Sequence, residues 1–330
     1  MSVSTPANLI IPNASARHKI KMENNKLTLD PNDPKVIQAK NAEQALFEFY
    51  RLQAKDHCIY LPKQAIKVRV SEIGSGKPIV IVPGNTGDVF PLSSLLAQLK
   101  GRRIIAINRP GGGLSEGMNY NLVDIGQFAI DTLDTVFETF NLENADIVAH
   151  SIGAHWSTLF AMEKPNRVRR LVLLGNPGNI MGGKPPLIIR LIGKPFFSKL
   201  IIKLITQKDK SKALIALTKI GHSRSLLAKL PHQLGDAYYY FSLLPHYILS
   251  ATSMLQNAMP AIDALQLKKL SQPTALLLGT NDNFISQDLG EKIISEMPNG
   301  TFYSIKGSGH LPWLENPEEC GQLISDFIDK

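Results

Sequence analysis

One serine has neighbours that could make it a nucleophile. Ser151 lies in the segment 149–153 (Ala-His-Ser-Ile-Gly), directly after an aliphatic run and directly before a helical pattern. Small flanking residues suit a tight turn from strand to helix, which lifts one side chain above the edge of a sheet. The usual pattern is G-x-S-x-G, and Ala149 here replaces the first glycine. A serine that only caps the helix is the alternative interpretation.

A serine hydroxyl needs a base, because it is a poor nucleophile at neutral pH. His310 is the strongest candidate among the eight histidines. It lies in a glycine-rich loop, 307–313, which follows the last strand-like run of the chain. Such a loop can carry a side chain over the carboxyl edge of an α/β sheet, where these sheets place their sites. An exposed loop histidine is the alternative; His150 and His155, which flank the serine, are expected to be structural.

The base in turn needs an acid that orients it and stabilises its protonated form. Asp282 follows the aliphatic run 274–278 and precedes His310 by 28 residues, enough for one helix and one strand. Ser, Asp and His would then follow one another at successive strand ends. The rival position holds Asn176, which is no carboxylate, and Asp288 is expected inside a helix. A turn or helix cap is the alternative role for Asp282.

Donors for a developing oxyanion are the remaining requirement of acyl-transfer chemistry. Residues 83–87 (Pro-Gly-Asn-Thr-Gly) follow an aliphatic run, and Ile152 follows the candidate nucleophile. The backbone N–H groups of Asn85 and Ile152 are the natural pair, since free N–H groups at a helix N-terminus favour negative charge. A glycine-rich turn without a ligand is the alternative.

Short aliphatic runs alternate with helical patterns through most of the chain. The runs are 78–82, 103–107, 145–149, 168–174 and 274–278. Such runs are typical of strands buried on both faces of a parallel sheet, and the alternation predicts βαβ units and an α/β fold. A half-buried strand is predicted at 66–70, and a helix is predicted to begin near Asp33 with Pro34 at its first position.

The alternation breaks once, and the break predicts an insertion. The interrupting stretch is helical in pattern and is cut by prolines; one apolar helical face would contain Phe197, Leu200, Ile201, Leu204 and Ile205. We predict a helical cap over 178–263, inserted after the sixth strand. The α/β core would comprise 32–177 and 264–330, and residues 1–31 would form a loosely ordered extension.

Composition excludes several classes of protein. Charged residues make up 19% of the 330 residues and hydrophobic residues 44%, which excludes a disordered polyelectrolyte. The only cysteines, Cys58 and Cys320, exclude a disulfide framework or a cysteine-based zinc cluster and favour a reducing compartment. No apolar run reaches the roughly 18 residues of a membrane span, and residues 1–21 lack the apolar core of a signal peptide. A cytoplasmic location is therefore expected.

The positive charge of the chain is local. Its formal net charge is +8, yet 178–270 contains thirteen lysine and arginine residues against three aspartates, so the rest of the chain is net negative. No motif for reading nucleic acid accompanies these charges, so no nucleic-acid partner is expected. Solvated lysines on cap helices are the favoured interpretation. An anionic substrate, an acyl carrier or an anionic membrane surface is the sharper alternative. The oligomeric state is not predicted.

Together these segments resemble the α/β-hydrolase fold superfamily, in its cap-bearing serine hydrolase branch, over roughly 60–330. Residues 108–115 (Asn-Arg-Pro-Gly-Gly-Gly-Leu-Ser) are similar to the family's D-x-P-G-x-G-x-S turn, with asparagine in place of the acid. Residues 309–312 and 315–318 resemble its histidine loop. The family often has His-Gly before the oxyanion residue, where this chain has Pro-Gly. Its dehalogenases and epoxide hydrolases use an aspartate nucleophile, so Ser151 argues against both.

The resemblance implies attack by Ser151 on a carbonyl carbon, with His310 as base and Asp282 holding it. The amides of Asn85 and Ile152 would hold the oxyanion, and no metal or organic cofactor is implied. We expect hydrolysis of an ester, lactone or thioester, and the apolar cap predicts a pocket for a hydrophobic small molecule. Two alternatives stay open. The same triad could transfer the acyl group or cleave a C–C bond or cyanohydrin, and the fold could serve as a non-hydrolytic binding module.

Overall fold

The structure is a computed structural model that describes residues 26–175, 179–198, 210–257 and 259–330. Its centre is an eight-stranded sheet in the order β10-β9-β8-β7-β4-β5-β3-β2. The strands are β2 (Ala54–Leu61), β3 (Ile66–Ile73), β4 (Lys77–Val82), β5 (Arg102–Ile107), β7 (Ala145–His150), β8 (Val168–Leu174), β9 (Thr274–Gly279) and β10 (Gly300–Ile305). Neighbouring strands run parallel, except that β3 is antiparallel to both β2 and β5. The predicted mostly parallel sheet is confirmed.

Helices cover both faces of this sheet. One face packs against α3 (Ile125–Thr139), α4 (Ile152–Glu163) and α11 (Gln287–Ser295), and the other packs against α1 (Pro34–Phe49), α2 (Ser93–Leu96), α12 (Pro312–Glu315) and α13 (Pro317–Ile328). Successive strand residues alternate between the two cores: Val80 and Val82 face one, and Ile79 and Ile81 face the other. Because both faces are buried, the central strands β4, β7 and β9 consist mostly of aliphatic residues.

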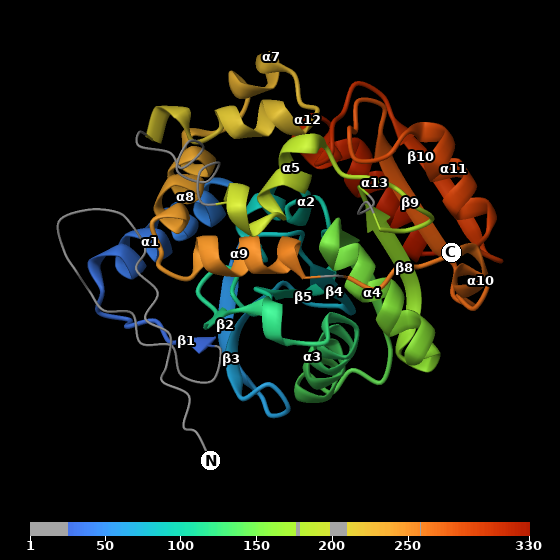
Figure 1. The fold of residues 1–330 in the computed structure, drawn as a ribbon, viewed down its shortest axis with the longest axis horizontal. Helices are drawn as coiled ribbons and strands as arrows, with labels where there is room; N and C mark the ends of the chain where they lie inside the picture. Colours follow the sequence, from blue (N-terminus) through green and yellow to red (C-terminus); the bar gives the residue numbers. More distant parts are fainter. Residues whose placement is uncertain (1–25, 176–178, 199–209, 258) are drawn as a thin grey trace.

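The segment between β8 and β9 leaves the sheet. Strand β8 is the sixth strand of the main sheet along the chain. The described elements that follow it are α5 (Leu187–Ile192), η4 (Lys210–Lys212), η5 (Ile215–Ile220), α7 (Arg224–Leu227), α8 (His232–Ser242), α9 (Tyr247–Gln256) and α10 (Ala264–Leu267). Figure 1 shows α7 in yellow at the top of the view and α8 in orange at the left, whereas α3 lies at the bottom. Most of the apolar helical face predicted to begin at Phe197 lies outside the described residues.

Some elements differ from the prediction. Strand β2 was not predicted, because it is an edge strand with polar side chains at most positions and only Ile59 and Leu61 are buried in it. Within the extension expected at 1–31, residues 1–25 lie outside the described part, and β1 (Lys26–Leu27) pairs with β6 (Gly117–Met118). The remaining short elements are η1 (Phe90–Leu92), η2 (Tyr120–Leu122) and η3 (Pro165–Arg167).

The first helix begins where it was predicted to begin. Helix α1 has Pro34 at its first position, and the side chain of Asp33 accepts a hydrogen bond from the Lys35 N–H at 2.8 Å.

Among the described residues, no helix is both long enough and apolar enough to cross a membrane.

Candidate active site at the carboxyl edge of the sheet

Ser151 occupies a strained turn between β7 and α4. Its φ of +50° and ψ of −119° are rare for a residue with a side chain and cost about 1–3 kcal/mol. The Ser151 N–H lies 3.0 Å from the carbonyl oxygens of both Leu174 and Gly175, which hold the turn in place. A Cβ on Gly153 would lie only 2.3 Å from the carbonyl oxygen of Val82, so the chain needs glycine there. The turn presents the serine hydroxyl at the end of β7.

The structure brings the three predicted side chains together. His310 Nε2 lies 3.0 Å from Ser151 Oγ, and His310 Nδ1 lies 2.8 Å from Asp282 Oδ2. The side chains of His310 and Asp282 are 4% and 0% exposed. Because a carboxylate only accepts hydrogen bonds, we assign the proton to Nδ1, which leaves Nε2 free to accept the serine proton. The arrangement therefore supplies a hydroxyl, a base and an acid in one chain of hydrogen bonds.

Aromatic and backbone contacts fix the plane of the His310 imidazole. The Phe284 ring stacks on it with 3.8 Å between centroids and 12° between planes. The Phe284 N–H also donates to Asp282 Oδ1 at 2.7 Å, so one residue orients both members of the pair. Neither contact was predicted, because Phe284 carries no motif of its own.

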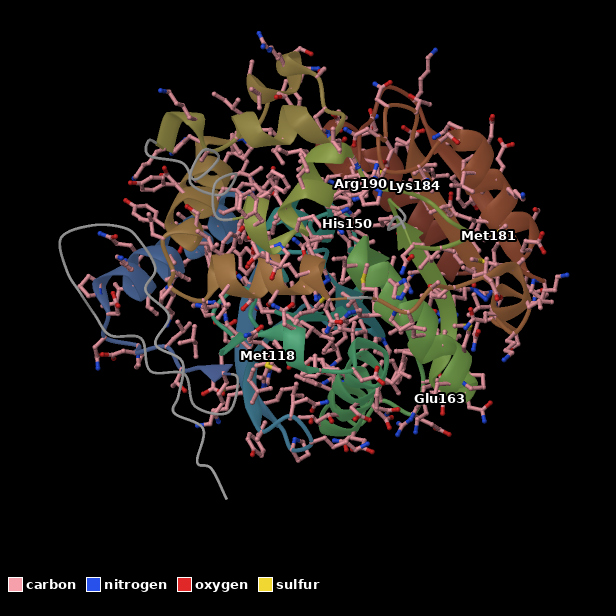
Figure 2. All side chains as sticks on the ribbon, viewed as in Figure 1. Met118, His150, Glu163, Met181, Lys184 and Arg190 are labelled. Carbon is pink, nitrogen blue, oxygen red and sulfur yellow. The ribbon has the colours of Figure 1, made fainter. Side chains whose placement is uncertain are left out.

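His150 lies beside His310 and borders the same cavity as Ser151. Its Nε2 lies 3.2 Å from the carbonyl oxygen of His310, and its ring packs against His310 and Trp313. Burial, together with the neighbouring His310, holds the pKa of His150 well below its usual value, so the ring stays neutral. Figure 2 labels His150 near the middle of the molecule. The expected structural role of His155 agrees with its complete burial in α4.

The two predicted oxyanion donors border the same cavity as Ser151. Asn85 and Ile152 both line it, and Ile152 is the first residue of α4. Within the described residues, neither of these backbone N–H groups donates to a protein acceptor. Both amides are therefore candidates to donate to a substrate oxygen bound in this cavity.

A buried arginine holds the loop that carries Asn85. Arg109 is 1% exposed; its Nε donates to the carbonyl of Pro83 at 3.0 Å, and its Nη2 donates to the carbonyls of Gly84 and Asn85. The guanidinium also lies 4.7 Å above the ring of Trp156. Sequence analysis noted Arg109 only as part of the 108–115 turn. No local pattern marks its role, because the carbonyls that it bonds lie 24 to 26 residues earlier in the chain.

Residues 77–317, well over half of the chain, match the family model described as alpha/beta hydrolase fold. The chain belongs to the α/β-hydrolase fold family. The resemblance inferred from the sequence motifs is therefore confirmed.

Several known proteins resemble this α/β hydrolase over most of its length. An uncharacterized hydrolase of Bacillus subtilis (strain 168) is 26% identical over 254 residues, which cover 76% of this chain and 89% of the relative. A 2-hydroxy-6-oxononadienedioate/2-hydroxy-6-oxononatrienedioate hydrolase of Pseudomonas putida is 24% identical over 283 residues, or 80% and 92% of the two chains. The crystal structure of naproxen esterase from Bacillus subtilis superposes with a TM-score of 0.66 at 16% identity, covering 91% and 99%. That structural likeness shows the shared fold.

The α/β hydrolase has a mostly apolar cavity above Ser151. Its volume is about 430 Å³, and its apolar lining residues include Pro91, Leu92, Ile188, Ile189, Ile192, Leu217, Leu255 and Met259. Helix α5 and η5, from the segment between β8 and β9, supply much of this lining. This part of the structure agrees with the expected pocket for a hydrophobic molecule.

Two charged side chains line the cavity of the α/β hydrolase. Lys212 is exposed, whereas Asp88 is 1% exposed and accepts a hydrogen bond from the Gly113 N–H at 2.5 Å. Burial raises the pKa of Asp88 to about 7. Asp88 was not singled out by sequence analysis.

The described residues contain no group of three or more His, Cys, Asp or Glu side chains arranged to hold a metal ion.

Proposed function

We propose that this α/β hydrolase cleaves a carboxylic ester, lactone or thioester of a hydrophobic small molecule through an acyl-enzyme on Ser151. The observation that carries the proposal is the position of His310, which bridges the Ser151 hydroxyl at 3.0 Å and the Asp282 carboxylate at 2.8 Å. A buried serine, histidine and aspartate linked in this order form the arrangement that activates a serine nucleophile.

The proposed reaction has two half-reactions. Ser151 Oγ attacks the carbonyl carbon while His310 Nε2 takes the hydroxyl proton, and Asp282 stabilises the resulting imidazolium. When the tetrahedral intermediate collapses, the leaving group departs with the proton from His310. A water molecule then gives a proton to His310, attacks the acyl carbon and releases the carboxylic acid, and the proton returns to Ser151.

The oxyanion of each tetrahedral intermediate is assigned to the N–H groups of Asn85 and Ile152. Two fixed donors aimed at the charge that develops in the transition state lower the barrier, because they do not have to reorient during the reaction. Neither amide has an acceptor in the part of the chain that the structure describes, and the buried Arg109 holds the loop from behind; both observations support the assignment.

The side chains that line the cavity favour an ester whose acyl and alcohol parts are both uncharged. Apolar side chains form most of the lining, and among the described lining residues Lys212 is the one lysine or arginine that could attract an anionic group. The buried carboxyl of Asp88 would repel a negatively charged group of the substrate, particularly above the Asp88 pKa of about 7.

C–C bond hydrolysis is the second candidate function. It is favoured by the Pseudomonas putida relative, which is named for a dienedioate substrate and covers 80% of this chain. A dienedioate carries two carboxylates, which this cavity complements less well than a neutral ester. Acyl transfer to another acceptor and non-hydrolytic binding remain alternatives with no specific observation in their favour.

A substrate panel with serine variants tests the proposal. Wild type, Ser151→Ala and Ser157→Ala would be assayed with p-nitrophenyl esters, a lactone and 2-hydroxy-6-oxononadienedioate. Ser157 is the matched control, because it is a buried serine of α4, the helix that follows Ser151. We expect ester turnover in wild type and Ser157→Ala and its loss in folded Ser151→Ala. Equal ester turnover in all three would overturn the assignment. Turnover of the dienedioate alone would favour the second candidate.

The charges on the outer surface of the cap support the hypothesis of an anionic partner. Residues 179–198 and 210–235 contain no aspartate or glutamate. Lys184, Arg190 and Lys194 are exposed there beside Leu187 and Phe196, which are 65% and 86% exposed. Figure 2 labels Lys184 and Arg190 in the upper part of the molecule. Cationic side chains next to exposed apolar ones fit an anionic membrane surface better than an acyl carrier.

The cytoplasmic location stays a prediction, which cell fractionation would test.

A further inference from the structure

Two cap residues, Gly221 and His222, dock onto the two loops that carry Asp282 and His310. We propose that His222 is a positioning residue, which holds the His310 loop in place directly at Leu311 and, through Glu315, at Gly309. This inference rests on the proposed role of His310 as the base. It assigns to the cap a part in aligning the reacting groups, in addition to its part in lining the cavity.

The backbone on both sides of His310 is tied to one buried side-chain pair. The N–H of Leu311 donates to His222 Nε2 at 3.3 Å, and the N–H of Gly309 donates to Glu315 Oε2 at 3.4 Å. His222 Nδ1 lies 2.5 Å from Glu315 Oε1, which joins the two anchors. The His222 side chain is 0% exposed and that of Glu315 is 11% exposed. The loop can therefore shift only if this pair breaks or moves with it.

The hydrogen-bond partners define the protonation of His222. Because the Leu311 N–H is a donor, His222 Nε2 must accept, and the ring proton is assigned to Nδ1, which donates to the Glu315 carboxylate. A side chain that offers one acceptor and one donor in this order is therefore required. Glutamine offers both groups, whereas alanine offers neither.

Glycines allow the cap backbone to touch both loops. Gly221 has a φ of +91°, and a Cβ there would lie 2.2 Å from the carbonyl oxygen of Asn281, the residue before Asp282. A Cβ on Gly309 would lie 2.9 Å from His222 Nδ1. The segment 221–222 thus lies against the turn of the proposed acid and the loop of the proposed base.

The position of His222 predicts which kinetic constant it affects. His310 and Leu311 line the cavity, but His222 is not among its lining residues. Loss of the His222 contact would therefore leave substrate binding largely intact and would loosen the 3.0 Å approach of His310 to Ser151. Misplacement by about 1 Å costs up to about 100-fold in rate.

The experiment compares two buried cap histidines. His246 is the matched control, because it is completely buried and its Nε2 lies 3.1 Å from the core carbonyl of Gly113, away from the loop of His310. We would measure kcat and KM with a p-nitrophenyl ester for wild type, His222→Ala, His222→Gln, Glu315→Gln and His246→Gln. The downfield NMR resonance of the proton between His310 and Asp282 would be recorded for each, with circular dichroism as the folding check.

The positioning role predicts a specific pattern. His222→Ala should lower kcat about 10- to 100-fold and change KM less than about threefold. It should also shift the downfield resonance, whereas His222→Gln should recover most of both. His246→Gln should leave kcat and the resonance unchanged even where it lowers the melting temperature. If His222→Ala does not fold, Glu315→Gln decides: one amide oxygen cannot accept from both His222 Nδ1 and the Gly309 N–H, so this variant should lower kcat with little change in KM.

Unchanged kcat and an unshifted resonance in folded His222→Ala or, where that variant does not fold, in Glu315→Gln would overturn the inference, as would a rise in KM alone or an equal loss of kcat in His246→Gln. These outcomes are separate from failure of the proposed function. That failure would appear as ester turnover that survives Ser151→Ala, and the resonance would then still report whether His222 positions His310.

Discussion

Arg109 donates a hydrogen bond to the carbonyl oxygen of Gly84. That carbonyl belongs to the same peptide group as the N–H of Asn85, and in a trans peptide the two point in opposite directions. Arg109 therefore fixes the direction of the amide that we assign to the oxyanion. Its hydrogen bonds to the carbonyls of Pro83 and Asn85, each 3.0 Å long, hold the residues on either side of that peptide group.

Arg109→Lys is expected to impair the reaction rather than substrate binding. A lysine keeps the positive charge but cannot bond three consecutive carbonyls with a planar fork of donors. We expect kcat for a p-nitrophenyl ester to fall about 10- to 100-fold with KM changed less than about threefold. Arg103→Lys, which alters an arginine paired with Glu72, is the control. An increase in KM at constant kcat would contradict the assignment.

Asp88→Asn is expected to stabilise the protein at neutral and alkaline pH. The folded-state pKa of Asp88 is about 7 and its unfolded value is about 3.9, so the folded state binds more protons between these values. The unfolding free energy of wild type therefore falls as pH rises from about 4 to about 7, by roughly 4 kcal/mol at most. Asparagine keeps the acceptor for the Gly113 N–H and removes the titration.

Urea unfolding of wild type and Asp88→Asn at pH 5 and pH 8 would check this. The difference in unfolding free energy should be clearly larger at pH 8. The same difference at both pH values would show that Asp88 does not titrate in this range.

Gly153→Ala is expected to disrupt the turn that presents Ser151. The added Cβ would lie 2.3 Å and 2.4 Å from the carbonyl oxygens of Val82 and Pro83, so α4 would have to move away from the sheet. We expect a loss of about 3 kcal/mol in unfolding free energy and loss of ester turnover. In the control Gly101→Ala, the new Cβ has no atom within 4 Å, and only backbone strain of about 1 kcal/mol is expected. Equal effects of the two variants would contradict this account of the turn.

The surface that contains Lys184, Leu187, Arg190, Lys194 and Phe196 is expected to bind anionic vesicles. Sedimentation with phosphatidylglycerol and with phosphatidylcholine vesicles would compare wild type with Phe196→Ser and with Phe49→Ser. Phe49 is the control, because it is 53% exposed on α1. We expect binding to phosphatidylglycerol alone, weakened by salt and by Phe196→Ser but not by Phe49→Ser. Equal binding of all three proteins, or none, would refute a membrane role for this surface.

The sequence contained enough information to predict the sheet and the meeting of Ser151, Asp282 and His310. Each of these residues lies within three residues of the end of an aliphatic strand or in a glycine-rich loop, and parallel strands place their carboxyl ends at one edge. Strand β2 escaped prediction because an edge strand needs no regular alternation of buried residues.

The supporting residues could not be predicted, because their roles depend on contacts between distant segments. Arg109 bonds carbonyls that lie 24 to 26 residues earlier, and His222 meets Leu311 across 89 residues. No local pattern marks the carbonyl or amide that such a side chain will meet. Burial of Asp88 depends in the same way on the three-dimensional packing of its loop.

Mass spectrometry of the acylated protein tests the central claim most directly. Wild type, Ser151→Ala and His310→Gln would be mixed with a p-nitrophenyl ester, quenched in acid within milliseconds to seconds and digested with a protease. The proposal predicts that the acyl mass lies on Ser151 in wild type, is absent from Ser151→Ala and accumulates far more slowly in His310→Gln. Ester turnover with the acyl group on another residue, or turnover that persists in Ser151→Ala, would contradict it.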